Sequence, residues 1–158
     1  MSARDRSRET VIEQGTATQK SPAALAARIP LGESSRASTS RAGIPIASSS
    51  DRQWVEDLLE HLGIGQGWAH VACADGDRER AKPDPALYLE ALDAIGIPAR
   101  DVLALEDSPN GVLAAKGAGL FCVAVPCALT ASLDLSAADV EVPSLAGIKL
   151  EGLLSLFK

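Results

Sequence analysis

The spacing of apolar residues along residues 43–125 changes repeatedly between two patterns. Short apolar runs near residues 44–47, 70–73, 102–106 and 120–125 have the length of buried strands. Between them lie longer stretches whose apolar residues recur every three or four positions, as on one face of an amphipathic helix. Strands that alternate with helices in this way predict an α/β fold, with a parallel sheet covered by helices on both faces.

Local signals predict where the helices begin. Before the first helix, Ser50 and Gln53 have the spacing of a capping box. The second helix is expected to open with Asp84 as N-cap and Pro85 in the first helical position, and residues 108–109 repeat this start for a third helix. The core face of the second helix is expected to consist of Tyr88, Ala91, Leu92 and Ile95.

Residues 1–40 differ in character from the rest of the chain. They hold seven Ser, four Thr, six basic and four acidic residues, and no aromatic residue. No hydrophobic period lasts long enough to define an amphipathic helix, although Ala23 to Leu31 fits either a short helix or a strand. We therefore expect a disordered or non-native tail over residues 1–40 and one folded domain over residues 41–158. Its acidic residues disfavour an organellar transit peptide.

Charge and composition narrow the class of protein. The net charge of -6 disfavours a nucleic-acid partner, and no apolar run approaches the roughly 20 residues of a membrane-spanning helix. The three cysteines have no C-x-x-C spacing, and Cys122 in an apolar run is expected to be a buried free thiol. A protein of the cytoplasm is the simplest expectation. The oligomeric state stays open.

Polar groups follow three of the predicted elements at the places where open α/β sheets bind ligands. Ser48 starts a serine run before a helix, where hydroxyls and free amides form a phosphate cradle, although such a turn is more often only a cap. Lys82 stands before the second helix, where a solvated surface lysine is the alternative. Glu106 and Asp107 end an apolar strand, and two carboxylates there repel each other unless a cation compensates.

Taken together, these groups predict a site for a phosphate with a magnesium ion. Carboxylate oxygens suit Mg²⁺, which commonly uses one or two carboxylates with phosphate oxygens. Phosphoryl transfer depends mainly on positioning and charge compensation, which the serine, lysine and acidic groups would provide. A nucleophile is not visible among these residues.

Two segments that carry these residues resemble hydrolases of the haloacid dehalogenase (HAD) superfamily. They read K-P-D-P-A-L-Y-L at residues 82–89 and V-L-A-L-E-D-S-P-N-G-V at residues 102–112. The nearest subgroup contains β-phosphoglucomutase and small sugar-phosphate phosphatases, whose second motif the turn at residues 48–50 resembles. The resemblance covers about residues 41–156.

The resemblance implies a three-layer Rossmann-like core with a parallel sheet. It also implies a Mg²⁺-dependent phosphatase or phosphomutase that acts on a small phosphorylated metabolite such as a sugar phosphate. The implied roles are phosphate binding for Ser48, Ser49 and Lys82, catalytic charge neutralisation for Lys82, metal binding for Glu106 and Asp107, and weaker substrate-loop contacts for Ser108 and Asn110.

The chain also departs from the family pattern. Members begin with a strand that carries a D-x-D motif with the nucleophilic aspartate, whereas Asp5 is the only Asp before residue 51 and lacks a D-x-D partner. Asp51 begins a helix and is expected to face away from the site. The helical cap domain, which would select the substrate, has no room either. The missing strand normally lies between those ending at Ser48 and Asp107, so we expect two exposed strand edges.

These departures predict an N-terminally incomplete family member, from a truncated or frameshifted gene, that is inactive or nearly so as this chain. The alternative is a non-catalytic remnant, a module that binds phosphate and metal without turnover. The identity of the substrate stays open.

Overall fold

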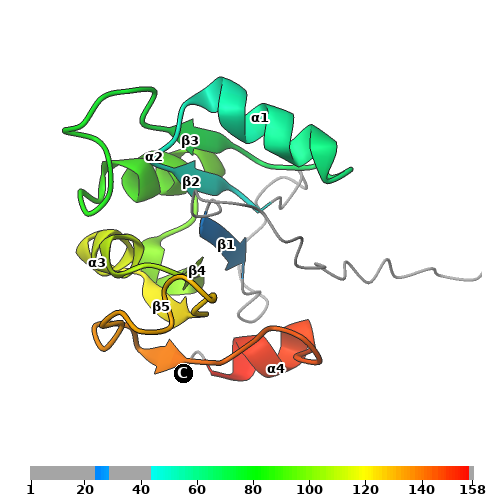
Figure 1. Ribbon diagram of the computed structural model, residues 1–158, viewed down its shortest axis with the longest axis vertical. Helices are drawn as coiled ribbons and strands as arrows, with labels where there is room; N and C mark the ends of the chain where they lie inside the picture. The colour runs from blue at the N-terminus through cyan, green and yellow to red at the C-terminus, as the bar shows by residue number, and fades with distance from the viewer. Residues whose placement is uncertain (1–23, 29–43, 157–158) are drawn as a thin grey trace, which may run out of the picture.

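A computed structural model describes residues 24–28 and 44–156, which form one sheet with helices on both sides (Figure 1). The six strands follow one another in space in the order β3-β2-β1-β4-β5-β6. In sequence they are β1 (Ala24–Arg28), β2 (Ile46–Ser48), β3 (Val71–Cys73), β4 (Val102–Glu106), β5 (Phe121–Ala124) and β6 (Val140–Glu141). The four strands expected from the apolar runs are confirmed to within two residues at each end.

Helices alternate with these strands as the periodicity predicted. They are α1 (Arg52–His61), α2 (Ala86–Ile95), α3 (Pro109–Gly117) and α4 (Leu150–Ser155), with a short 3-10 helix η1 (Ala99–Asp101) before β4. This alternation confirms the α/β class and a Rossmann-like core. None of the helices in the described part of the chain is long and apolar enough to cross a membrane.

The strand β1 lies in the middle of the sheet and runs antiparallel to both of its neighbours, β2 and β4. The other neighbouring strands are parallel, so the sheet is mixed at this one place. The two edges that we expected to be exposed are therefore paired, which gives their backbone N–H and C=O groups partners. The expectation of a disordered tail is corrected at Ala24–Arg28, and the other residues of that segment lie outside the described ranges.

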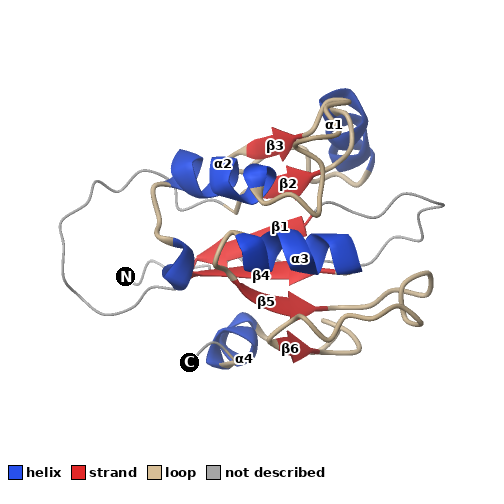
Figure 2. Cartoon of the chain, turned by 90° about the vertical axis from the view of Figure 1, so that its left-hand side faces the viewer, coloured by secondary structure: helices blue, strands red, loops and turns tan. Residues whose placement is uncertain are grey.

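The core has two sides because side chains of a strand alternate between the faces of the sheet. In β4, Ala104 packs with α2 and α3, whereas Leu103 and Leu105 pack with Leu153 of α4. Val55 of α1 packs on this second face, beside β2 and β3. Helices α2 and α3 therefore cover one face and α1 and α4 the other, in three layers (Figures 1 and 2).

The predicted start of α3 is confirmed. Ser108 is its N-cap, with Oγ accepting a hydrogen bond from the amide of Gly111 at 3.2 Å, and Pro109 stands in the first turn. The start of α2 is shifted by one residue: Pro85 is the N-cap, and Asp84 Oδ1 accepts from the amide of Ala86 at 2.8 Å.

The predicted capping box of α1 is wrong. Asp51 is the N-cap and its side chain caps nothing, while Gln53 donates to Asp57 at 2.9 Å instead. The acceptor at this helix start comes from the loop after β3, where Asp75 Oδ1 accepts from the amide of Arg52 at 2.6 Å. A partner 23 residues away along the chain decides this helix start, so a local spacing rule could not find it.

The carboxyl ends of the parallel strands all lie on the same side of the sheet (Figure 2). There β2 ends at Ser48 and β4 at Glu106, and each strand is followed by a turn that leads into the next helix. The polar residues singled out in the sequence come after strands that end on this side.

Candidate functional site

The serine turn after β2 is held to the loop before α2 by side-chain hydrogen bonds. Ser48 is only 3% exposed, and its Oγ accepts from the amide of Ser50 at 3.2 Å. Ser49 Oγ accepts from the amide of Lys82 at 2.9 Å. Both hydroxyls thus serve as acceptors within the protein, and each keeps its own proton to donate elsewhere.

Lys82 forms a buried ion pair at the end of β4. Its Nζ lies 2.6 Å from Glu106 Oε1, and the side chains are 9% and 2% exposed. Tyr88 donates its hydroxyl to the same Oε1 at 2.5 Å, and Lys82 Nζ lies 5.1 Å from the centroid of the Tyr88 ring. Burial, followed by the adjacent Glu106 carboxylate, raises the pKa of Tyr88 well above its usual value, so the hydroxyl stays a donor.

Asp107, next in sequence, lacks a comparable set of partners. The residue is 9% exposed, and its Oδ2 is buried with no hydrogen-bond partner in the described part of the protein. Burial raises the pKa of this carboxyl, the Glu106 carboxylate raises it further, and Lys82 opposes both. A buried carboxylate oxygen without a donor is costly unless a cation or another donor reaches it.

The loop after Asp107 is shaped around the Glu106 carboxylate. A Cβ added at Gly111 would overlap the carboxylate of Glu106, so only glycine allows the first turn of α3 to approach this closely. Ser108 caps the same turn, and Asn110 lies in it. The motif E-D-S-x-x-G therefore has a steric basis in this chain.

These residues surround a cavity of about 680 Å³ at the carboxyl ends of the strands. Its lining is Ser48, Ser49, Ser50, Asp51, Gly76, Lys82, Glu106, Ser108, Pro109, Asn110, Thr130 and Leu133. The structure thus brings together six of the seven site residues that the sequence suggested. The seventh, Asp107, stands directly beside the lining residues without being one of them.

Sequence reasoning missed several contributors to this site. Tyr88 was assigned to the core face of α2, where it is indeed buried, but its hydroxyl also holds Glu106. Asp51 lines the cavity although its place at a helix start suggested that it faces away. Thr130 comes from the loop after β5, which carried no motif. Only Tyr88 offered a signal, since a buried tyrosine hydroxyl needs a partner.

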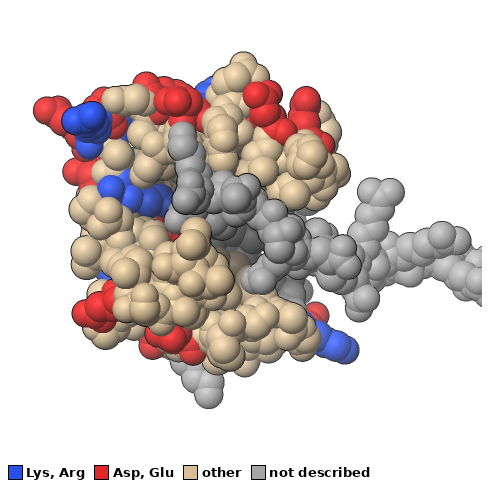
Figure 3. Space-filling model, in the orientation of Figure 1, with Lys and Arg blue, Asp and Glu red and all other residues tan. Residues whose placement is uncertain are grey.

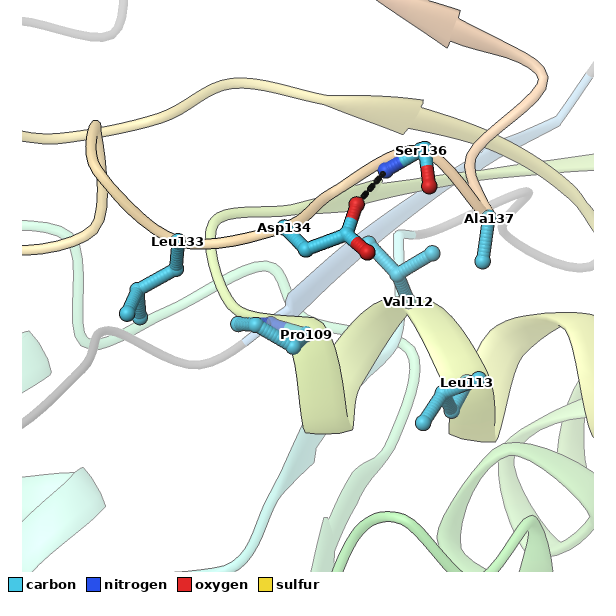
Figure 4. A pocket seen from close by; sticks show the side chains of 7 residues that line it. All are labelled: Pro109, Val112, Leu113, Leu133, Asp134, Ser136 and Ala137. Carbon is cyan, nitrogen blue, oxygen red and sulfur yellow. Dashed lines mark hydrogen bonds between the residues drawn. The ribbon is translucent and has the colours of Figure 1, made fainter.

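A second, smaller cavity of about 270 Å³ lies over the start of α3. It is lined by Pro109, Val112, Leu113, Leu133, Asp134, Ser136 and Ala137 (Figure 4). Its walls are mostly apolar apart from Asp134 and Ser136, and Asp134 Oδ1 accepts a hydrogen bond from the amide of Ser136 at 2.9 Å. Pro109 and Leu133 line both cavities, so the two are neighbours.

The carboxylate oxygens at the site can be compared with the ligands that a hard divalent cation requires. Within residues 24–28 and 44–156, no three His, Cys, Asp or Glu side chains gather closely enough to hold a metal alone. The unpartnered Oδ2 of Asp107 suits such an ion, whereas Glu106 Oε1 is already bound to Lys82 and Tyr88. Asp107 with water and phosphate oxygens is a donor set of the kind that Mg²⁺ uses.

Comparison with known proteins gives this architecture a family. Residues 39–119 match the model of the haloacid dehalogenase-like hydrolases. Curated relatives include YhcW of Bacillus subtilis (strain 168), which is named among phosphatases, with 41% identity over 70% of this chain and 50% of that protein. Another is the validoxylamine A 7'-phosphate phosphatase of Streptomyces hygroscopicus subsp. limoneus, with 35% identity over 69% of this chain and 50% of that protein.

Among solved structures, a β-phosphoglucomutase from Clostridium difficile superimposes with a TM-score of 0.60 at 24% identity. The match covers 72% of this chain and 48% of that one, and at this identity it speaks for the fold alone. The chain spans about half the length of the curated relatives it matches.

Proposed function

The chain belongs to the haloacid dehalogenase-like hydrolases, and on that premise we propose that it supplies the phosphate-binding and metal-binding part of a phosphatase or phosphomutase. The proposed substrate class is a small phosphorylated metabolite such as a sugar phosphate. One observation carries the proposal: the serine turn and the Lys82–Glu106 pair line one cavity, with the unpartnered Asp107 carboxylate beside it.

Ser48 and Ser49 at the end of β2, together with Lys82, would bind the phosphate. The hydroxyls of Ser48 and Ser49 accept from backbone amides, so their protons are free for phosphoryl oxygens. Lys82 gives one of its three N–H donors to Glu106 and keeps two for a bound phosphate. The buried Glu106 and Tyr88 hold that ammonium in place, which makes Glu106 a positioning residue for Lys82.

Metal binding falls to Asp107. Its Oδ2 is the carboxylate oxygen that has no hydrogen-bond partner in the described protein, so it is available as a metal ligand. Glu106 Oε2 is a second carboxylate oxygen at the same strand end. A bound Mg²⁺ would supply positive charge that offsets the charge of the phosphoryl group. The hydroxyls of Ser48 and Ser49 and the ammonium group of Lys82 would orient the phosphate.

Turnover requires an acceptor in line with the leaving oxygen. Asp5 is the only Asp before residue 51, and it lies outside the described residues. Asp51 lines the cavity, but it is exposed and stands at the start of α1. We therefore expect the chain, expressed as printed, to bind phosphate with Mg²⁺ and to show little or no hydrolysis.

A small metabolite is favoured over a nucleic acid by charge. The net charge is -6, and acidic side chains are scattered over the described part of the face seen in Figure 3, where basic ones form no broad patch. A polyanion held by phosphate contacts needs several Lys and Arg side chains on one surface. A single buried Lys82 suits one phosphate group instead.

The test is to purify the chain and titrate inorganic phosphate by calorimetry with and without Mg²⁺, beside assays with an aryl phosphate and a set of sugar phosphates. We expect Mg²⁺-dependent binding that Ser48→Ala and Asp107→Asn weaken. Ser155→Ala, an exposed serine at the end of α4, should leave binding unchanged. Absence of Mg²⁺-dependent binding in the folded chain would contradict the proposed site.

The same assays address the non-catalytic alternative. Robust turnover that Asp107→Asn abolishes would show that the chain is an active enzyme and that its acceptor is one we have not identified. In that case Asp51→Asn is the next variant, because Asp51 is a carboxylate that lines the cavity. Binding without turnover is the result expected of a module that holds phosphate and metal.

A further inference from the structure

The smaller of the two cavities adjoins the phosphate cavity over the start of α3, because Pro109 and Leu133 line both. One wall is a face of α3, since Pro109, Val112 and Leu113 lie three and four positions apart on that helix. The other wall is the loop between β5 and β6, at residues 133–137 (Figure 4). A molecule bound by its phosphate in the larger cavity therefore has a second hollow beside it.

The walls of this second cavity are mostly aliphatic and partly exposed. Val112 is buried, whereas Leu113 and Leu133 are 49% and 48% exposed. A bound apolar group would remove part of these two leucine side chains from water, which is favourable in proportion to the apolar area covered. Aliphatic walls with few polar groups are typical of sites for small ligands. The cavity therefore favours an apolar occupant.

The size of the cavity suits a ring. Its volume is about 270 Å³, whereas an apolar cavity of roughly 150 Å³ already holds benzene. A ring with one or two small substituents therefore fits. A fully hydroxylated ring suits these walls less well, because hydroxyls that face aliphatic side chains lose their hydrogen bonds to water.

Asp134 adds a charged acceptor to this cavity. Its Oδ1 accepts from the amide of Ser136, and its Oδ2 accepts no hydrogen bond from the lining residues drawn in Figure 4. Hydrogen bonds from Ser136 lower the pKa of Asp134, so the carboxylate is ionised at neutral pH. A hydroxyl or amino group on the ring can donate to Oδ2, whereas a second phosphate or a carboxylate on the ring would be repelled.

We propose that this cavity is the subsite for the organic group of the phosphorylated ligand, and that it takes an apolar ring that carries a hydroxyl or amino donor. The ligand would span both cavities, with its phosphate at Ser48 and Lys82 and its ring between Leu113 and Leu133. The inference rests on the proposed function for the position of the phosphate. It narrows the proposed class of small phosphorylated metabolites to monophosphates of phenols and of alcohols with an apolar ring.

The test is calorimetric titration of the purified chain, in the presence of Mg²⁺, with inorganic, methyl, phenyl and benzyl phosphate. We expect the tighter of the two ring-bearing phosphates to bind about tenfold more tightly than methyl phosphate, as partial burial of one ring allows. Leu113→Ala should reduce this ratio by roughly threefold or more, because it removes part of the wall. Leu89→Ala is the matched control, since Leu89 lies on α2, is 50% exposed and lines neither cavity.

A charged ring tests the role of Asp134. We expect 4-carboxyphenyl phosphate to bind more weakly than phenyl phosphate, and Asp134→Asn to narrow the difference. Asparagine keeps an oxygen that can accept from the Ser136 amide, so the variant removes the charge and leaves the turn its acceptor. A difference that Asp134→Asn leaves unchanged would overturn the part assigned to this carboxylate.

The outcomes separate this inference from the proposed function. If the chain binds inorganic phosphate but binds methyl, phenyl and benzyl phosphate equally well, the subsite is refuted and the proposed function stands. Equal reductions of the ratio in Leu113→Ala and Leu89→Ala would also refute the subsite. Ring-dependent binding through Leu113 without any binding of inorganic phosphate would refute the phosphate site and keep the ring site, and no binding of any probe would refute both.

A second copy of the chain is the competing occupant of this cavity. Light scattering that shows a dimer in the wild type and a monomer in Leu113→Ala would mean that another protomer covers the cavity, and would overturn the proposal. We expect the two proteins to have the same mass in solution. Circular dichroism of each variant shows that it is folded before its binding is compared.

Discussion

Two strand-to-helix units meet at the site, and they are built in different ways. The unit of β4 and α3 is specified locally: Ser108 caps the helix, and Gly111 leaves room for Glu106. The unit of β2 and α1 has no side-chain cap from Asp51, and its helix start depends on Asp75 from another loop.

The two units also differ in charge. The end of β4 buries two carboxylates, of which one is paired and one is not, whereas the end of β2 contributes neutral hydroxyls. The charged unit should therefore be the more sensitive to substitution and to pH, because buried charge is costly when its compensation is removed. The unit of β2 and α1 should tolerate more changes, since its ion pairs, such as that between Arg52 and Glu56, are exposed to solvent. The following substitutions would break or sharpen this contrast.

The largest effect is expected for Lys82→Met. It leaves Glu106 buried with only the Tyr88 hydroxyl as a hydrogen-bond donor in the described part of the protein, and removal of one member of a buried pair costs about 3–5 kcal/mol. Urea unfolding should show the loss, and the double variant Lys82→Met with Glu106→Gln should recover most of it.

A half-exposed ion pair elsewhere in the fold gives the control for this substitution. Arg80 pairs with Glu90, with side chains 40% and 34% exposed, so Arg80→Met should cost less than about 1 kcal/mol. Equal losses in Lys82→Met and Arg80→Met would contradict the view that burial makes the Lys82–Glu106 pair special.

Gly111→Ala should be the next most damaging change. The added methyl group would overlap the Glu106 carboxylate, and overpacking of this kind costs about 1–3 kcal/mol even though alanine favours a helix. Gly117→Ala in the same helix is the matched control, because its Cβ would meet Pro85 only at an ordinary contact distance of 3.4 Å. Thermal unfolding should show Gly111→Ala destabilised and Gly117→Ala neutral or slightly stabilised; the reverse order would refute the steric account of the motif.

The N-caps of the two units give a smaller and more direct comparison. Ser108→Ala should cost about 1 kcal/mol of unfolding free energy, because it removes the acceptor for the Gly111 amide. Asp51→Ala, at the equivalent position of α1, should cost almost nothing by this route, since its side chain caps nothing. Asp75→Ala should instead weaken the start of α1, which hydrogen exchange at the Arg52 amide can detect. A loss in Asp51→Ala as large as in Ser108→Ala would contradict the contrast.

The smallest effect is expected to be a gain, from Asp107→Asn without metal. Burial and the Glu106 carboxylate raise the pKa of Asp107 in the folded state, so its contribution to stability is fully present below its unfolded pKa and is lost as pH rises through the folded value. Asn stays neutral, so the variant should be the more stable one at neutral pH, with the difference vanishing in acid. Urea unfolding from pH 4 to pH 8 measures this, and a gain that grows toward acid would have the wrong sign.

Much of this architecture was accessible from the order of residues. The apolar runs located β3, β4 and β5 because a strand buried on both faces must be continuously apolar. Ser108 and Pro109 located the start of α3 because the cap and the fixed φ of proline act within one turn. The positions of Lys82 and Glu106 beyond predicted strands pointed to one site because open α/β sheets bind ligands at the carboxyl ends of their strands.

Other features required the tertiary structure. Pairing of β1 in the middle of the sheet depends on partners in β2 and β4 that lie far away along the chain, so a segment that fits either helix or strand cannot reveal it. The different partners of Glu106 and Asp107 could not be predicted either. Two adjacent carboxylates have the same chemistry in the sequence and differ only in their burial and contacts in the folded chain. Contacts within one turn of the chain determine features such as the start of α3 at Ser108. Contacts between distant segments determine that Glu106 is paired with Lys82 and that Asp107 Oδ2 has no partner in the described protein.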